Sequence, residues 1–99
     1  MPVRHQIDRP EMGITQADFL RVFAPLVAPN ELAVEGASMS AGLAAGGHIH
    51  VTLSAPKMRI IGALKLPILN VHLEFRECTQ AAIAEFVGRF DRAFHKGGG

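Results

Sequence analysis

The amino-acid sequence predicts an α+β fold: a two-layer sandwich in which a four-stranded antiparallel meander sheet carries two helices on one face, in the order α-β-β-β-β-α. Residues 69–76 alternate without exception between apolar and polar side chains, and residues 48–55 alternate in the same way. Residues 15–24 and 80–95 instead place apolar side chains at helical spacing. Alternation is typical of a strand with one buried face, and helical spacing of a helix with one buried stripe. All four segments can therefore cover a single core.

The two helices have recognisable beginnings. Thr15 can cap the first helix, and Asp18 three residues later gives an acidic variant of the capping box. Pro25 has no N–H to donate, so we expect this helix to end or kink near Ala24. Thr79 caps the second helix in the same way. The predicted apolar stripes are Phe19, Val22, Phe23 and Leu26 in the first helix, and Ile83, Phe86, Val87, Phe90 and Phe94 in the second.

The four strands are predicted at residues 31–35, 48–55, 57–64 and 69–76. Residues 36–47, between the first two strands, are almost entirely Gly, Ala and Ser. Such residues offer little side-chain area to bury and lose much entropy on ordering, so we interpret this stretch as a mobile loop or the tip of a long hairpin.

The domain organisation follows from these boundaries. Prolines, a glycine and mixed charges in residues 1–13 predict a flexible N-terminal arm. Residues 14–96 are then predicted to form a single α+β domain, because a chain of 99 residues is long enough for one modest core. Residues 97–99 are glycines and are predicted to be a flexible tail.

Composition narrows the classes of function. Apolar residues make up 48% of the chain and charged residues 19%, and the surplus of apolar surface favours burial in a dimer or against a ligand. A net charge of +1 gives no electrostatic basis for binding nucleic acid or an anionic membrane. A single cysteine excludes an internal disulfide. The first 13 residues lack the apolar core of a signal peptide, and no apolar run approaches the roughly 20 residues of a membrane helix. We therefore expect a cytoplasmic protein without membrane insertion.

Pairing apolar with apolar residues across neighbouring strands predicts the register. A turn at residues 55–56 would set Met58 opposite Leu53, and a turn within 65–68 would set Ile60 opposite Leu73. The open face of the sheet would then carry Thr52, Arg59 and Glu74 in one row, with His50, Ile61 and His72 in the next.

This open face is the predicted binding surface. Arg59 and Glu74 would form a cross-strand ion pair. Ile61 and Ile68 bring an apolar strip onto an otherwise polar face, which is typical of a contact surface. The predicted interface residues are His50, Arg59, Ile61, Ile68, His72 and Glu74.

Two further hypotheses concern reactive side chains. His48, His50 and His72 supply nitrogen ligands that would suit zinc, but the predicted register sets His50 and His72 roughly 9.5 Å apart, so we favour solvated histidines. Cys78 precedes a helix N-terminus, whose dipole favours a thiolate. The sequence contains no nucleotide-binding or serine-hydrolase motif, and no cofactor is predicted. With all six phenylalanines in apolar phases and no Trp or Tyr, RNA binding by base stacking is not expected.

We therefore predict a small cytoplasmic binding domain without catalytic activity, acting through the open face of its sheet as a homodimer or as an adaptor to another protein. The first alternative is a protein that binds a metal or a small apolar ligand, with the strand histidines or a cavity under residues 36–47. The second is a thiol-dependent function at Cys78.

Overall fold

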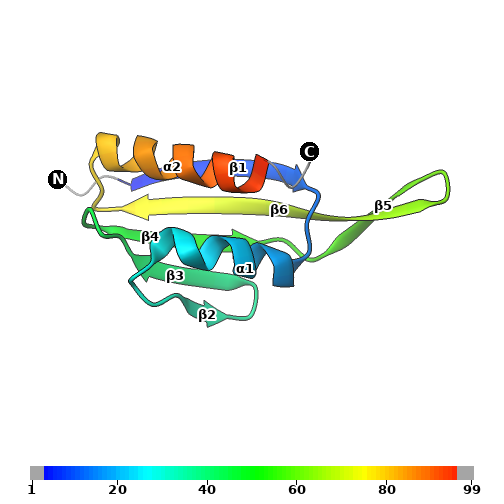
Figure 1. Cartoon of the computed structure of the whole chain (residues 1–99), viewed down its shortest axis with the longest axis horizontal. Coiled ribbons are helices and arrows are strands. Elements are labelled where there is room, and N and C mark those ends of the chain that lie inside the picture. The colour runs from blue at the N-terminus through cyan, green and yellow to red at the C-terminus, as the bar shows by residue number, and fades with distance from the viewer. Residues whose placement is uncertain (1–3, 96–99) are drawn as a thin grey trace.

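The computed structural model describes residues 4–95, which form two helices and six strands (Figure 1). In chain order these are β1 Arg4–Met12, α1 Gln16–Val27, β2 Ala33–Glu35, β3 Ser38–Gly42, β4 His48–Leu53, β5 Lys57–Ile61, β6 Leu64–Arg76 and α2 Gln80–His95.

All strand pairs are antiparallel, and the order across the sheet is β1-β6-β4-β3-β2, with β5 paired to the first part of β6. Both helices pack on one face of the sheet (Figure 1). Their phenylalanines meet the inward side chains of β6 and β4 in a single core. The predicted α+β class, the antiparallel sheet and the placement of the helices are confirmed. The sheet has six strands in place of the predicted four.

One added strand is β1, which lies where a flexible arm was expected for residues 1–13. Arg4–Met12 pairs with β6 at an edge of the sheet, and Ile7 and Met12 pack against the core. The register shifts between Arg9 and Met12, so Pro10 lies at a bulge, where an edge strand tolerates a residue without an N–H. The bulge interrupts the alternation of apolar and polar residues along β1. Without that pattern, the prolines, glycine and mixed charges of residues 1–13 suggested a loose arm. Residues 1–3, and the predicted glycine tail at 97–99, lie outside the described residues.

The other added strand is β3, in the Gly/Ala/Ser stretch at 36–47. Gly36 turns the chain with φ +62°, and Ser38–Gly42 then pairs with both β2 and β4. Met39 and Ala41 are buried. A strand between two others gains a backbone ladder on each side, and this compensates for the small side chains that predicted a loop.

Helix α1 continues through Pro25 to Val27 and does not end near Ala24. Phe23 and Val27 are both buried on its inner stripe. Their burial outweighs the one hydrogen bond that Pro25 cannot donate. The cap is as expected, because the Asp18 N–H donates to Thr15 Oγ1 at 3.2 Å.

The pairing of β5 differs from the predicted register. Residues 55–56 do not form a turn that pairs β5 with β4. Both strands pair with β6 instead, so β4, β5 and β6 form one long hairpin. Leu53 lies opposite Val71 and Lys57 opposite Ile68, so three residues face two across the ladder. Because of this bulge, odd-numbered residues face the core in β4, whereas even-numbered residues share the core-facing phase in β5.

Candidate functional site: an apolar arm and the concavity at its base

The outer half of the long hairpin leaves the sheet as a two-stranded arm, here called the β5–β6 arm and defined as residues 57–68 (Figure 1). Ile61 pairs with Leu64 across a two-residue loop. Gly62, the first loop residue, has φ +59°, as expected for the tight turns that match the twist of a hairpin. The arm accounts for the elongated shape of the molecule, whose extents are 50 × 26 × 24 Å.

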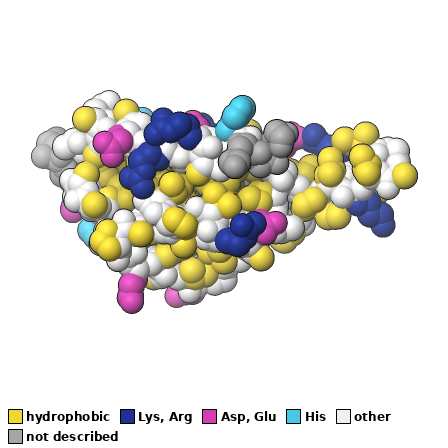
Figure 2. All heavy atoms as spheres, in the orientation of Figure 1, with side chains coloured by type: hydrophobic (Ala, Val, Ile, Leu, Met, Phe, Trp, Pro, Cys, Tyr) yellow, Lys and Arg dark blue, Asp and Glu magenta, His cyan; other side chains and the backbone are white. Residues whose placement is uncertain are grey.

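The arm exposes large apolar side chains on both of its faces. Met58 and Ile60 share the phase of the core-facing residues of β6, whereas Ile61 and Leu64 share the phase of the open face. Ile60 is 68% exposed and Leu64 62% exposed, and Figure 2 shows this apolar surface beyond the body of the molecule. Among residues 4–95, the large apolar residues that are exposed on the arm are Met58, Ile60, Ile61, Leu64 and Leu66, and Val34 is exposed on β2.

The charges of the arm are all positive: Lys57, Arg59 and Lys65. Arg59 reaches back to the body and forms an ion pair with Glu11 on β1. Neither lysine forms an ion pair within the part of the chain that the structure describes. The arm is therefore both apolar and cationic.

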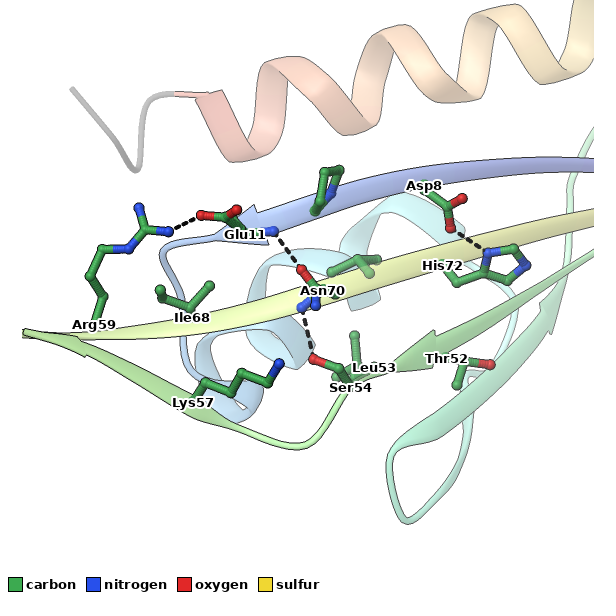
Figure 3. Close-up of a pocket in the computed structure, with 12 residues that line it drawn as sticks. Asp8, Glu11, Thr52, Leu53, Ser54, Lys57, Arg59, Ile68, Asn70 and His72 are labelled. Carbon is green, nitrogen blue, oxygen red and sulfur yellow. Dashed lines mark hydrogen bonds and ion pairs between the residues drawn. The ribbon is translucent and has the colours of Figure 1, made fainter.

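A concavity of about 890 Å³ lies on the open face at the base of the arm (Figure 3). Its origin is a pair of bulges, because β1 and the β4–β5 strand each carry an extra residue where they pass Asn70 of β6. The Asn70 side chain accepts a hydrogen bond from the Glu11 N–H at 2.7 Å, and the Asn70 N–H donates to Ser54 Oγ at 2.9 Å. The lining also includes Asp8, Thr52, Lys57, Arg59, Ile68 and His72.

The most chemically distinctive contact in this concavity joins Asp8 on β1 to His72 on β6. Asp8 Oδ1 lies 2.6 Å from His72 Nδ1, a geometry in which a carboxylate orients an imidazole. Thr52 lies directly across the ladder from His72. Within residues 4–95 no hydroxyl group is hydrogen-bonded to His72.

The six residues predicted for the interface share one face but fall in two groups. His50 lies directly opposite Glu74, with His72 one row further along β6. Arg59, Ile61 and Ile68 lie on the arm. The expected Arg59–Glu74 pair does not form, because Arg59 lies opposite Leu66 and contacts Glu11, while Glu74 accepts a hydrogen bond from Arg76 at 2.6 Å.

Asp8 and Glu11 are the site residues that sequence reasoning missed. Both belong to β1, which composition had suggested was a loose arm. The local signal was weak, because only Ile7 between the polar Gln6 and Asp8 fits an alternation, and the bulge at Pro10 interrupts the pattern.

The histidines considered as alternative metal ligands are spread over two strands. His48 lies opposite Arg76, His50 opposite Glu74, and His72 is in contact with Asp8. Within residues 4–95 no group of three His, Cys, Asp or Glu residues is arranged to hold a metal ion.

Cys78 is only 4% exposed, with Sγ directed at the Arg76 carbonyl oxygen 3.3 Å away. It packs beneath Gly47, and this burial limits the access of reagents to the thiol. The predicted cavity beneath the Gly/Ala-rich stretch corresponds to a hollow of about 60 Å³ along residues 43–45. Ligand pockets commonly measure about 300–1,000 Å³, so the concavity at the base of the arm is the better candidate by size.

No protein-family model, curated protein or solved structure matches this chain. None of the described helices is long and apolar enough to cross a membrane. The arm and the concavity are therefore the features from which a function can be inferred.

Proposed function

We propose that this chain is a protein-binding domain that forms a homodimer, with the β5–β6 arm as its main contact surface. The observation that carries the proposal is the exposure of large apolar side chains on both faces of a two-stranded ribbon. An isolated two-stranded hairpin is only marginally stable in water. Full burial of a Leu or Ile side chain contributes about 1.5–3 kcal/mol, so covering the arm is strongly favourable.

Charge favours a second copy of the chain as the partner. Lys57 and Lys65, which form no ion pair within residues 4–95, lie among the apolar residues of the arm. At the β2 edge of the sheet, Val34 is 48% exposed and lies between Glu31 and Glu35 in the sequence. Neither glutamate forms an ion pair within residues 4–95. An apolar, cationic arm on one copy is thus matched by an apolar, acidic edge on another.

The experiment is to measure solution mass by sedimentation over a concentration series, for the wild type and for Ile60→Asp. We expect the wild type to approach twice the chain mass of 10.6 kDa, and Ile60→Asp to remain at the monomer mass at the same concentrations. Ile60 makes little contact with the body, so the variant should retain the wild-type circular dichroism. Ala84→Asp, which adds the same charge to an exposed position of α2, is the matched control and should remain dimeric.

A wild type that is monomeric at every concentration would refute the homodimer. So would an Ile60→Asp variant that keeps the dimer mass. A monomeric wild type that co-sediments with anionic vesicles through the arm would instead assign the arm to a lipid surface.

A further inference from the structure

We propose that β5 of each arm adds to β2 of the other copy as an antiparallel strand, so that two chains related by a two-fold axis perpendicular to the sheet make two identical contacts. This inference rests on the proposed homodimer and names the surface that receives the arm. It is supported by the free strand edges, by the geometry of the sheet and by the side-chain register.

Both strands have an unpaired edge. In the described part of the chain, β5 pairs only with β6, and β2 pairs only with β3 at the end of the sheet order. Each edge leaves a row of backbone N–H and C=O groups without ladder partners, which is a template for strand addition. Strand β2 has only three residues, all exposed, so a strand added beside it would gain both backbone and side-chain contacts.

The direction of the strands suits a two-fold axis. Strands β4 and β5 both run antiparallel to β6, so they share a direction. Strand β2 has this direction as well, because β3 lies antiparallel to both β2 and β4. A two-fold rotation about an axis perpendicular to the sheet reverses strand direction, so β5 would meet the partner's β2 in antiparallel orientation.

The spacing of the sheet also fits. Strand β4 leads into β5 along β6, and β3 and β2 lie between β4 and the edge of the sheet; further out the arm twists, and β5 crosses over β6 (Figure 1). Beside the base of the arm, before this crossing, the space is therefore two strands deep. The partner can fill it with its own β2 and β3, and the same rotation sets the partner's arm along β2 of the first copy. One geometry thus satisfies both arms at once.

The alternation of side chains restricts the register. Val34 lies opposite the buried Met39, so it belongs to the helix-bearing side of the sheet, as do Met58 and Ile60. A rotation about an axis perpendicular to the sheet leaves the helix-bearing sides of both copies facing the same way. Val34 can therefore lie opposite Met58 or Ile60 of the partner chain. The first register sets Glu35 opposite Lys57, and the second sets it opposite Arg59. Both registers that cover Val34 with a large apolar residue therefore pair Glu35 with a cation.

Cysteine cross-linking tests this contact directly. Residues directly opposite in an antiparallel pair have Cα atoms about 4.5–5.5 Å apart, which lies within the range of a disulfide. We expect either the Val34→Cys/Met58→Cys or the Val34→Cys/Ile60→Cys double variant to run as a covalent dimer on a non-reducing gel after mild oxidation. The three single variants should remain monomeric on the gel, and so should the wild type, whose only thiol is buried.

Two outcomes would overturn the inference and leave the homodimer intact. In the first, Met58→Cys or Ile60→Cys cross-links alone, which would show that arm meets arm. In the second, neither double variant cross-links although sedimentation shows a dimer that Ile60→Asp dissociates. Monomeric mass for the wild type would refute both the inference and the proposed function, so the two failures are distinguishable.

Discussion

At the scale of single residues, Gly47 is the most closely surrounded of the described glycines. Its φ is +83°, and a Cβ placed there would lie 2.5 Å from Cys78 Sγ and 2.6 Å from the Glu77 carbonyl oxygen. Left-handed backbone costs a non-glycine residue about 1–2 kcal/mol, and overpacking about 1–3 kcal/mol. We expect Gly47→Ala to lower the free energy of unfolding by about 2–5 kcal/mol in urea denaturation.

Gly46 provides the matched control. Its φ is +100°, but nothing lies within 4 Å of the position of an added Cβ. Gly46→Ala should therefore cost only the backbone term, about 1–2 kcal/mol. Equal losses for the two variants would show that the packing of Cys78 and Glu77 against residue 47 contributes nothing.

For the residues of the candidate site, the sequence predicts which face each side chain lies on but not which residues it contacts. Alternation correctly indicates the face on which His50, His72 and Glu74 lie, because side-chain direction follows from local periodicity. It does not indicate their neighbours. The partner of Arg59 depends on a bulge at residues 54–56, where a single extra residue changes every pairing beyond it.

At the scale of secondary-structure elements, one ion pair fastens β1 to α2. Arg9 donates to both carboxylate oxygens of Asp91, at 3.0 Å from Nε and 2.9 Å from Nη2. The hydrogen bond to Asp91 raises the pKa of Arg9, so its charge, and the stability that depends on that charge, persists from neutral to strongly alkaline pH and is lost only above the raised pKa. Both side chains are partly exposed, so solvent screens the pair.

We expect Arg9→Gln and Asp91→Asn each to lower the free energy of unfolding by about 0.2–1 kcal/mol, since this is the usual range for exposed pairs. The double variant should lose little more than either single variant. A double-mutant cycle from urea denaturation measures this coupling. Fully additive losses would show that the two side chains stabilise the protein independently.

Helices and strands with a regular apolar pattern could be predicted from the sequence. Strands that form only because they pair with distant parts of the chain could not. The two helices and the strands at β4 and β6 follow from their apolar patterns. Strand β3 consists of small residues whose order comes from ladders on both sides, and β1 depends on pairing with β6 across most of the chain. Neither cause is local, so neither leaves a local signal.

At the scale of the whole molecule, the outward course of the arm was not predictable. Residues 57–64 have the composition of an ordinary strand, and nothing local indicates that their partner is the part of β6 that leaves the sheet. Their apolar residues on both faces were visible in the sequence. That pattern gained its meaning only when the structure showed that neither face of the arm is covered by the body of the chain.

Deleting the arm tests whether it stabilises the fold or serves only for association. The core lies within the helices and the inner strands, and the arm contributes no residue to it. Replacing residues 57–68 with Asn-Gly should reconnect β4 to the inner part of β6 through a short hairpin loop. We expect the shortened chain to unfold cooperatively in urea and to sediment as a monomer at concentrations where the full chain is dimeric. A shortened chain that is folded and still dimeric would show that the body alone supplies the contact, and one without cooperative unfolding would show that the arm belongs to the folding unit.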